Sequence, residues 1–471
     1  MVVRECVAAW HDDSALAESI TLRVTGKAVP SAARLLADLP PCKSHAQRVL
    51  ACALLRPASA GPSLAVSGLG GDLSTASVDI GIMNAACRAL GLRIEELGRD
   101  GGSLRLVPPP LPWSGEQPVR LDAYQNGTAG RMLGALVAAR AALAVLDGTP
   151  ALRRRPMAAL TEALRAAGAT VTSASDDPDR LPLTIDARGL RDSSFDGAVI
   201  DAGVTTQVAS GWMIAVASRV ATDGRARRLR IRRPRARGYL EMTAAVVTAV
   251  LGVGVRGFDA EGDADLALEL HPDSDPAPAF VVPQDPSGFA FPVVLAAMHG
   301  LPLPAFESSA ATLRHPDLEI VGDAAAIAAS PAGQCCVIEG LGARPDTFTA
   351  LVALAATRPG ETVLRGAPQL RVKESDRIEA MAAVLMAFGV PCEPLDDGLI
   401  VRGPKVLGEG AGASLHVPAP DDHRVVMAAA VLATALPVGT AVTLHPAAAV
   451  TKSWPGFWDW LDRAVAGVAL D

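Results

Sequence analysis

The stretch from Leu370 to Met381 reads LRVKESDRIEAM and predicts a helix with an unusual charge pattern at its start. Over Asp376 to Gly389 the apolar residues recur at helical spacing, and the closing glycine can cap the helix. Arg371, Lys373 and Arg377 crowd the N-terminal end, where the helix dipole favours negative charge and each cation costs up to ~1 kcal/mol. Two interpretations are open: an anionic ligand binds among these cations, or the acidic residues of the stretch balance them at a solvated helix start.

Length and composition exclude several classes of protein. With 471 residues, half of them apolar, the chain can form two to three domains, or one large repetitive architecture, with a sizeable core. The formal net charge of −7 argues against nucleic acid as the main partner. Seven cysteines without CxxC spacing, and an N-terminus without a signal-peptide core, indicate a reduced, cytoplasmic protein. The longest apolar run, Val425 to Leu444, is broken by Pro437 and Gly439, which predicts a buried helix and a strand rather than a membrane span.

A polar turn leads directly into a nearly all-apolar helix six times along the chain. A helix that is apolar on all sides belongs in the middle of a domain. Most successive turns are about 80 residues apart, which indicates internal repeats, and one step of about 60 residues predicts that the fifth unit has lost part of a loop or strand. The six turns are Cys42-Lys43-Ser44, Asn126-Gly127-Thr128, Thr205-Thr206-Gln207, Asp285-Pro286-Ser287, Arg344-Pro345-Asp346 and Asp422-His423-Arg424.

Between these turns a second, amphipathic helix recurs, ends in glycine and precedes a β-like run. The glycines are Gly91, Gly168, Gly254 and Gly389. Each unit is therefore predicted to contain a buried helix, a strand, an amphipathic helix and another strand, in an α/β arrangement. We expect two similar domains of three such units each, built around buried helices as an inside-out α/β barrel. Helix N-termini that converge on a cleft between the domains would suit a ligand with several negative charges.

The polar residues of the turns indicate acid–base chemistry on an anionic substrate. Arginine binds phosphate or carboxylate through two hydrogen bonds, and lysine acts as a point charge. Glu374, His423 and the lysines can carry protons. Without a zinc, EF-hand, Walker or dinucleotide motif, neither a metal nor a cofactor is expected. The basic residues of interest are Lys43, Arg48, Arg131, Arg155, Lys373, Arg377, Arg424 and Lys452.

Eight short motifs occur in an order that resembles one known family. They are KxxxxR (43–48), NGTAGR (126–131), RRPM (154–157), TTQ (205–207), QDPS (284–287), LRVKESDRI (370–378), DHR (422–424) and TKSWPGF (451–457). Together they resemble the enolpyruvyl transferases, most closely the 5-enolpyruvylshikimate-3-phosphate synthases, over about residues 21 to 465. LRVKESDRI and DHR are the specific motifs, whereas NGTAGR or TTQ alone would be weak. The resemblance implies two domains of three repeats, which we expect at residues 1–40 plus 284–471 and at residues 41–283.

The resemblance also implies a reaction, the transfer of the carboxyvinyl group of phosphoenolpyruvate to an alcohol. The methylene carbon is protonated, the hydroxyl attacks the adjacent carbon, and phosphate leaves from a tetrahedral intermediate. The default acceptor is shikimate 3-phosphate, and the alternative is a nucleotide or nucleotide-sugar hydroxyl. A non-catalytic or RNA-end-processing protein on the same repeats is the rival of another class. The implied partners are these two small molecules, without nucleic acid, membrane or cofactor, and a monomer is expected.

Site residues follow position by position from the same resemblance. Phosphoenolpyruvate would be held by Lys43, Gly127, Arg155, Gln207, Arg377, Arg424 and Lys452. The phosphorylated acceptor would be held by Lys43, Ser44, Arg48, Thr205, Thr206, Gln207, Tyr239, Gln369 and Lys373. Glu374 would donate the proton, with Lys43 and Lys452 close to the reacting atoms.

Departures from the family pattern gather on the acceptor side. The pattern places an aspartate, the base for the acceptor hydroxyl, six residues before the aspartate of the Pro345-Asp346 pair. That position is Gly340, and the nearest acid is Glu339, one residue further away. Either Glu339 replaces the base or the base has moved. The phosphate-binding serine of the third repeat is also replaced, by Ala236.

Three polar residues at helix starts, and one glycine, have more than one interpretation. Asp376 and Asp422 are interpreted as helix caps and arginine partners rather than catalysts. His423 is either a structural hydrogen-bonding group or a proton carrier. Gly127 leaves room beside the expected phosphoenolpyruvate site, which in shikimate enzymes would predict sensitivity to glyphosate.

Overall fold

The protein is described by a computed structural model over residues 19–69, 76–97, 102–110, 115–258, 262–271, 275–306, 315–408 and 414–471. These residues divide into two compact units. Unit 1 comprises the described residues of 41–283 together with His315, and unit 2 comprises those of 19–40, 284–306 and 316–471. The chain therefore passes from unit 2 into unit 1 at Pro41 and returns at Gln284.

All six polar turns lead into buried helices, as predicted. In unit 1 these are α3 (Lys43–Leu54), α5 (Gly127–Ala139) and α8 (Gln207–Asp223). In unit 2 they are α10 (Pro286–Met298), α12 (Phe348–Thr357, after a 3-10 helix at Pro345–Thr347) and α14 (His423–Ala433). Asn126, Asp285 and Asp422 cap α5, α10 and α14 by accepting hydrogen bonds from backbone N–H groups.

The glycine-terminated helices are also present, with one boundary corrected. They are α4 (Val78–Ala89), α7 (Ala158–Ala167), α9 (Arg237–Leu251) and α13 (Arg377–Ala387). Gly91, Gly168 and Gly389 follow three of them with positive φ. The prediction of Gly254 at the end of α9 was wrong, because Gly252 caps this helix in the left-handed conformation. Gly254 instead lies in the next strand, where it pairs with Glu269.

Five four-stranded sheets share one pattern, a parallel pair followed by two antiparallel pairings. In four of them a buried helix (α5, α8, α12 or α14) connects the parallel strands, which confirms the repeated unit. In sheet order, unit 1 contains β13 (Ala279–Val281), β2 (Leu64–Ser67), β4 (Ser103–Val107) and β3 (Arg93–Leu97); β5 (Val119–Asp122), β6 (Leu143–Asp147), β8 (Leu183–Asp186) and β7 (Thr170–Ser173); and β11 (Val253–Arg256), β12 (Ala264–Leu270), β10 (Arg227–Arg232) and β9 (Ala198–Asp201). Unit 2 contains β14 (Cys336–Ile338), β15 (Gly360–Leu364), β17 (Gly398–Gly403) and β16 (Cys392–Leu395); and β18 (Ser414–Pro418), β19 (Ala441–His445), β1 (Ile20–Pro30) and β20 (Val465–Leu470).

The short repeat is the fourth, which begins with α10, and not the fifth as predicted. Between α10 and α12 the described residues form a 3-10 helix at Pro316–Glu319, α11 (Ile320–Ala329) and β14. Because β14 pairs with β15 of the following repeat, the described part of the fourth repeat has no sheet of its own. The final sheet of unit 2 is completed by β1 and β20, which lie at opposite ends of the chain.

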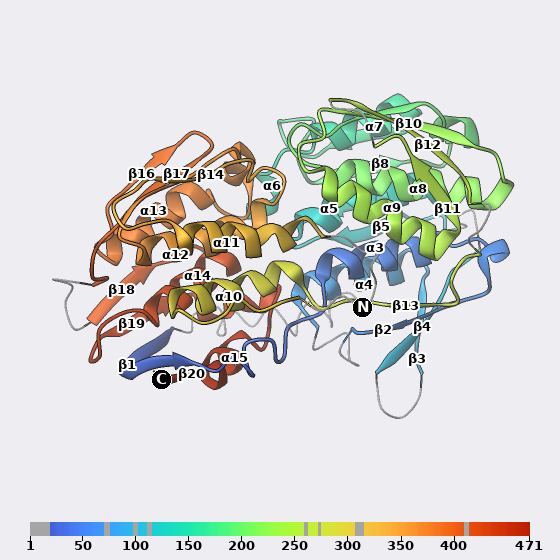
Figure 1. Cartoon of the computed structure of the whole chain (residues 1–471). Helices are drawn as coiled ribbons and strands as arrows, with labels where there is room; N and C mark the ends of the chain where they lie inside the picture. The colour runs from blue at the N-terminus through green and yellow to red at the C-terminus, as the bar shows by residue number, and fades with distance from the viewer. Residues whose placement is uncertain are drawn as a thin grey trace. The chain divides into compact units, whose positions relative to one another are not determined.

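Each unit has its buried helices at its centre. In unit 2, α10, α12 and α14 contact one another, and Figure 1 shows them between the sheet of β14–β17 and the sheet that contains β18 and β19. In unit 1, α8 contacts α3 and α5. A Cβ atom at Gly211 of α8 would lie 3.0 Å from the Cα of Met132 on α5, so glycine permits this close helix contact. Burial of each large apolar side chain in such a core contributes about 1.5–3 kcal/mol.

The longest apolar run folds as predicted, into α14 followed by β19. Over the ranges described above, none of the helices has both the length and the apolar character needed to cross a membrane.

Candidate functional site

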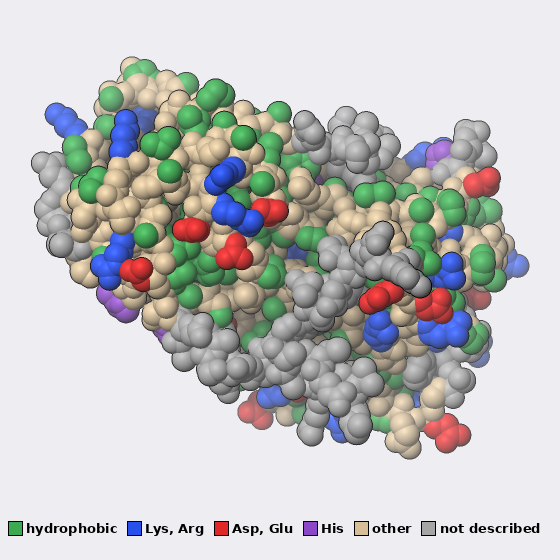
Figure 2. Space-filling view, turned by 90° about the horizontal axis from the view of Figure 1, so that it is seen from below, with side chains coloured by type: hydrophobic (Ala, Val, Ile, Leu, Met, Phe, Trp, Pro, Cys, Tyr) green, Lys and Arg blue, Asp and Glu red, His purple; other side chains and the backbone are tan. Residues whose placement is uncertain are grey.

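Exposed charges and buried charges behave differently in this protein. On the face shown in Figure 2, Lys and Arg side chains lie beside Asp and Glu side chains. Exposed pairs of this kind, such as Arg402 with Glu361 and Glu393, contribute only about 0–1 kcal/mol each. Buried charges cost much more unless they are paired, so groups of them mark candidate functional sites. Each unit contains one such group, at the N-terminal ends of its helices.

In unit 2 the starts of α13 and α14 gather four basic and three acidic side chains, which we call the unit 2 cluster. Asp376 caps α13 and Asp422 caps α14, which confirms the interpretation of both as caps. Arg377, the first residue of α13, donates to Asp422, and this ion pair links the two helix starts. The members of the cluster are Lys373, Arg377, Arg424, Lys452, Asp346, Glu374 and Asp422.

Arg377 is the most fully paired cation of the unit 2 cluster and is only 1% exposed. Its guanidinium donates to Asp346 Oδ1 at 2.8 Å, to Asp422 Oδ2 at 2.9 Å and to Glu374 Oε2 at 3.0 Å. Burial lowers the pKa of Arg377, but the Asp422, Glu374 and Asp346 carboxylates more than offset this and raise the pKa above its ordinary value. Arg377 therefore stays charged inside the protein.

The acidic residues do balance the cations at the start of α13, but this start is not simply solvated. Arg371 contacts Asp376 at 2.9 Å and Glu379 at 3.2 Å, as the solvated interpretation expects. Arg377 differs, because it is buried and its partners come from three separate stretches of chain. A buried cation with carboxylates around it can exchange some of these contacts for an anionic ligand.

Glu374, the predicted proton donor, lies between two cations predicted to hold phosphoenolpyruvate. Its Oε1 is 3.0 Å from Lys452 Nζ and its Oε2 is 3.0 Å from Arg377 Nη2. Lys452 ends a 3-10 helix, Ala447–Lys452, and is buried. The structure therefore brings the predicted donor and these two cations together.

Arg424 and His423 begin α14 and are both buried. Arg424 contacts Asp346 Oδ2 at 3.3 Å and donates to the Ser287 carbonyl at 3.2 Å. Burial lowers the pKa of Arg424, yet the pKa is raised overall because Asp346 outweighs the repulsion from Arg377. His423 Nδ1 lies 3.7 Å from Asp422 Oδ1, a position that supports its interpretation as a structural residue.

The predicted acceptor residues of unit 2 lie in two places. Lys373 belongs to the cluster, with Nζ 3.4 Å from Asp346 Oδ1. Gln369 donates to the Gly342 carbonyl at 2.8 Å. Glu339 is 60% exposed and pairs with Arg365, and the two line an open cavity of about 530 Å³ together with Asp396 and Asp397. The structure thus places Glu339 away from the cluster, because its side chain pairs with an arginine at the end of the neighbouring strand, β15.

In unit 1 the starts of α3, α4 and α5 are linked around Lys43. Lys43 Nζ is 2.8 Å from Asp79 Oδ2, and Asp79 lies in the first turn of α4. Asn126, the cap of α5, donates to the Asp79 carbonyl at 2.9 Å and to Gln47 Oε1 at 3.0 Å. Lys43 is therefore held beside the helix ends, where an anion is favoured.

Two arginines and a glutamine meet at the starts of α5 and α8. A Cβ atom at Gly127 would lie 2.7 Å from Arg155 Cζ and 2.9 Å from Arg131 Nη1, so both guanidinium groups lie against this glycine. Arg131 donates to Gln207 Oε1 at 2.7 Å, and Gln207 Nε2 donates to Thr128 Oγ1 at 2.8 Å. Three predicted phosphoenolpyruvate residues, Gly127, Arg155 and Gln207, are thus neighbours, with Arg131 connecting them.

Arg48, predicted to hold the acceptor, lies among α3, α8 and α9. It donates to Thr243 Oγ1 at 2.7 Å, to the Ser44 carbonyl at 2.8 Å and to Ser210 Oγ at 3.2 Å. Burial lowers the pKa of Arg48 to about 10. These contacts make Arg48 a connector of the three helices, and its role toward the acceptor stays a prediction.

The other predicted acceptor residues of unit 1 lie on α8, α3 and α9. Thr205 and Thr206 directly precede α8, and Thr205 Oγ1 accepts from the backbone N–H of Gln207 at 3.3 Å. Ser44 is in the first turn of α3. Tyr239, on α9, lies edge-on to His315 with ring centroids 5.2 Å apart.

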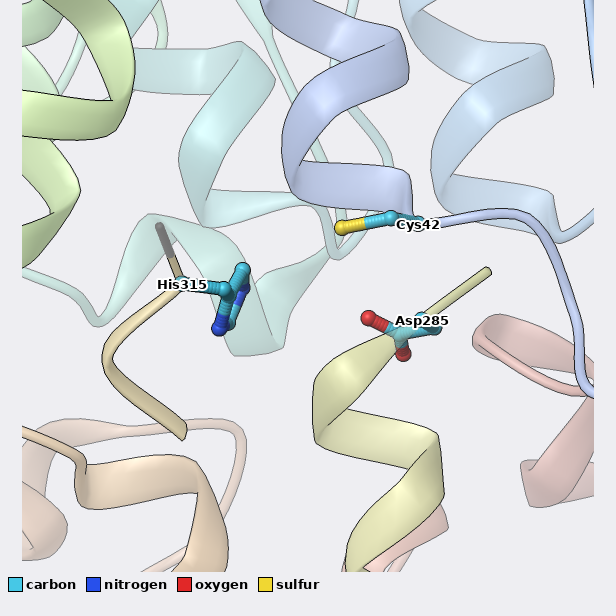
Figure 3. Close-up of side chains that lie close together, drawn as sticks. All are labelled: Cys42, Asp285 and His315. Atoms are coloured by element: carbon cyan, nitrogen blue, oxygen red, sulfur yellow. The ribbon is translucent and has the colours of Figure 1, made fainter. Parts of the chain in front are cut away.

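Cys42 and His45 lie at the start of α3 in unit 1. Figure 3 shows Cys42 where the chain enters this helix. His45 Nδ1 is 3.1 Å from Cys42 Sγ, and its ring centroid is 6.1 Å from that of His315. Burial, followed by the charges of His315 and Arg48, lowers the pKa of His45 well below its usual value, so His45 is neutral at pH 7.

Sequence comparison places this arrangement among known proteins. The profile of the family described as EPSP synthase (3-phosphoshikimate 1-carboxyvinyltransferase) matches residues 38–461. The chain is 31% identical over 459 residues to the 3-phosphoshikimate 1-carboxyvinyltransferase of Roseiflexus castenholzii, covering 92% of this chain and 98% of the relative. It is also 31% identical over 415 residues to the protein of that name from Halorhodospira halophila, covering 82% and 85%.

Solved structures show the same fold. An EPSP synthase from Acinetobacter baumannii matches with a TM-score of 0.67 and 22% identity, covering 96% of this chain and all of that one. The enolpyruvyl transferase NikO from Streptomyces tendae matches with a TM-score of 0.62 and 15% identity, covering 97% and 99%. The fold is therefore the two-domain α/β fold of the enolpyruvyl transferases. Within that class the chain belongs to the EPSP synthase (3-phosphoshikimate 1-carboxyvinyltransferase) family.

Proposed function

We propose that this protein transfers the carboxyvinyl group of phosphoenolpyruvate to a hydroxyl of shikimate 3-phosphate and releases phosphate. The family profile and the relatives named 3-phosphoshikimate 1-carboxyvinyltransferase support this acceptor over a nucleotide or nucleotide sugar. The observation that carries the chemistry is the position of Glu374, a carboxyl group held between Arg377 and Lys452.

Phosphoenolpyruvate carries a phosphate and a carboxylate, and both units present cations that suit them. We assign Arg377, Arg424 and Lys452 of unit 2, and Lys43 and Arg155 of unit 1, to binding this substrate. The arginines provide paired hydrogen bonds and the lysines provide point charges. Each unit also presents these groups at helix N-termini, whose dipoles favour an anion.

Glu374 handles the proton in both halves of the proposed reaction. When the anionic groups of phosphoenolpyruvate bind Arg377 and Lys452, they weaken the hold of these cations on Glu374, which favours its protonated form. Glu374 then gives its proton to the methylene carbon while the acceptor hydroxyl attacks the adjacent carbon and loses its own proton. As phosphate leaves the tetrahedral intermediate, Glu374 takes a proton back from the methyl group and the vinyl group is restored.

The remaining features of the proposal come from the sequence alone. A cytosolic location, a monomeric state and independence of cofactors and metals stay predictions. Ser44, Thr205, Thr206, Gln207, Tyr239, Gln369 and Lys373 are proposed for the acceptor on the family pattern. Gel filtration of the purified protein measures the monomer prediction directly.

The proposed activity is tested by phosphate release from phosphoenolpyruvate with shikimate 3-phosphate, and with a panel of nucleotides and nucleotide sugars. We expect turnover with shikimate 3-phosphate, and a Glu374→Gln variant with kcat lower by about 10²-fold or more. Glu393→Gln, at an exposed glutamate paired with Arg402, is the matched control and should keep wild-type kcat. Turnover with a nucleotide acceptor alone would replace shikimate 3-phosphate, and full activity of Glu374→Gln would remove the proposed proton donor.

A further inference from the structure

Asp346 is a carboxylate shared by three of the four cations of the unit 2 cluster. Its Oδ1 accepts from Arg377 Nη1 at 2.8 Å and from Lys373 Nζ at 3.4 Å. Its Oδ2 is 3.3 Å from Arg424 Nη2, and its backbone carbonyl accepts from Arg424 Nη1, also at 3.3 Å. The side chain is 18% exposed and lies in the 3-10 helix that leads into α12.

We infer that Asp346 is a positioning residue, which sets the spacing of Arg377, Arg424 and Lys373 for the anionic groups of phosphoenolpyruvate. This inference rests on the proposed function. Asp346 acts through the cations and not on the reacting atoms. Its two oxygens face different partners, so one carboxylate joins α13, α14 and the start of α12.

The other carboxylates of the cluster have different tasks. Asp422 pairs with Arg377, but it also caps α14 and accepts from Ser375 Oγ at 3.0 Å. Glu374 pairs with Arg377 and Lys452 and is the proposed proton donor. Asp346 is the acid that connects Arg377 to Arg424, the two arginines assigned to phosphoenolpyruvate.

The geometry of Asp346 makes Asp346→Asn an informative variant. A carboxylate accepts hydrogen bonds at both oxygens, whereas an amide of the same size accepts at one and donates at the other. Whichever way the amide turns, its NH2 group faces either Arg424 or the pair formed by Arg377 and Lys373. One side of the bridge is therefore lost without a change in side-chain volume, and the arginines lose their common partner.

The matched control is Asp323→Asn. Asp323 pairs with Arg344 at 2.6 and 2.8 Å, and the two side chains are 12% and 10% exposed, which is close to the burial of Asp346. Its printed ion pair involves no member of the unit 2 cluster. Loss of a largely buried ion pair thus affects stability in both variants, and an effect on phosphoenolpyruvate affinity separates them.

Steady-state kinetics with phosphoenolpyruvate and shikimate 3-phosphate test the inference. For Asp346→Asn we expect the KM for phosphoenolpyruvate to rise about tenfold or more, with kcat within about threefold of wild type, because misplaced binding groups weaken substrate binding. The KM for the acceptor should rise less, because the Lys373 contact is the longest. Asp323→Asn should leave both KM values within about twofold.

A second variant keeps the inference testable if Asp346→Asn does not fold. Asp346→Glu retains the charge and should lie between wild type and Asp346→Asn in its KM for phosphoenolpyruvate, with Asp323→Asn as the same control. A phosphoenolpyruvate KM in Asp346→Asn equal to that of Asp323→Asn overturns the inference, as does a loss confined to kcat. Asp346→Glu with a wild-type KM for phosphoenolpyruvate, or with one no lower than that of Asp346→Asn, overturns it as well. If the wild-type protein itself does not turn over these substrates, the proposed function fails and not the inference alone.

Discussion

Replacement of Gly127 by alanine should weaken phosphoenolpyruvate binding with little effect on folding. Gly127 is the first residue of α5, and an added Cβ atom would lie 2.7 Å from both Cζ and Nη1 of Arg155. It would also lie 2.9 Å from Arg131 Nη1. Because non-bonded carbon atoms prefer about 3.5–4.0 Å, the Arg155 guanidinium must move by about 1 Å.

The size of the effect follows from this displacement. A binding group misplaced by about 1 Å can cost up to about 10²-fold in rate or affinity. We therefore expect the KM for phosphoenolpyruvate to rise about 10- to 100-fold in Gly127→Ala, which corresponds to about 1.4–2.8 kcal/mol. The atoms in contact are the ends of flexible side chains, so folding should lose little, and alanine is the better helix former by up to about 1 kcal/mol.

The assay is steady-state phosphate release at varied phosphoenolpyruvate, combined with thermal unfolding of the same samples. Gly130→Ala in the same helix is the control, because its Cβ would meet Leu152 at 3.3 Å and Ala123 at 3.5 Å and no arginine within 4 Å is among its three nearest atoms. Gly130→Ala should keep the wild-type KM. A Gly127→Ala protein with unchanged KM and unchanged Tm would show that Arg155 does not bind phosphoenolpyruvate from this position.

Two further predictions concern unit 1. Burial, His315 and Arg48 lower the pKa of His45 in the folded protein, so below about pH 6.5 the unfolded chain binds one more proton and stability falls as pH falls. In urea unfolding between pH 6.5 and 5, wild type should therefore lose up to about 1.4 kcal/mol per pH unit more than His45→Gln, and equal slopes would contradict the burial of a neutral imidazole. Asp79→Asn removes the charge 2.8 Å from Lys43 Nζ and should lower kcat/KM about tenfold, whereas Asp186→Asn, whose pair with Arg188 is exposed, should not. Similar kcat/KM values for these two variants would show that Asp79 does not position Lys43.

Local patterns were enough to predict most of the helices. Each of the six buried helices begins at a polar turn because short side chains such as Asn126 and Asp422 cap the backbone N–H groups of the residues that follow. The error at α9 arose where two glycines lie close together. Gly252 and Gly254 offer equivalent local signals, and the pairing of Gly254 with Glu269 in the sheet decided between them.

Sequence motifs also placed the cations of the candidate site, but they did not identify the partners of those cations. Asp346 was recognised only as part of a helix entry, and Asp79 was not singled out. Asp346 is 31 residues from Arg377 and 78 residues from Arg424 along the chain. No spacing rule connects positions so far apart, so only the packing of helix starts against one another reveals these pairs.

The sequence by itself determined the repeated helix–strand units, the helix starts and the basic side chains they carry, because each depends on residues within one or two turns of chain. Tertiary structure decided which carboxylates hold those side chains, and that Glu339 faces Arg365 instead of the unit 2 cluster. The physical reason is that a charge in a protein interior must be paired, and its partner is chosen by the packing of distant segments.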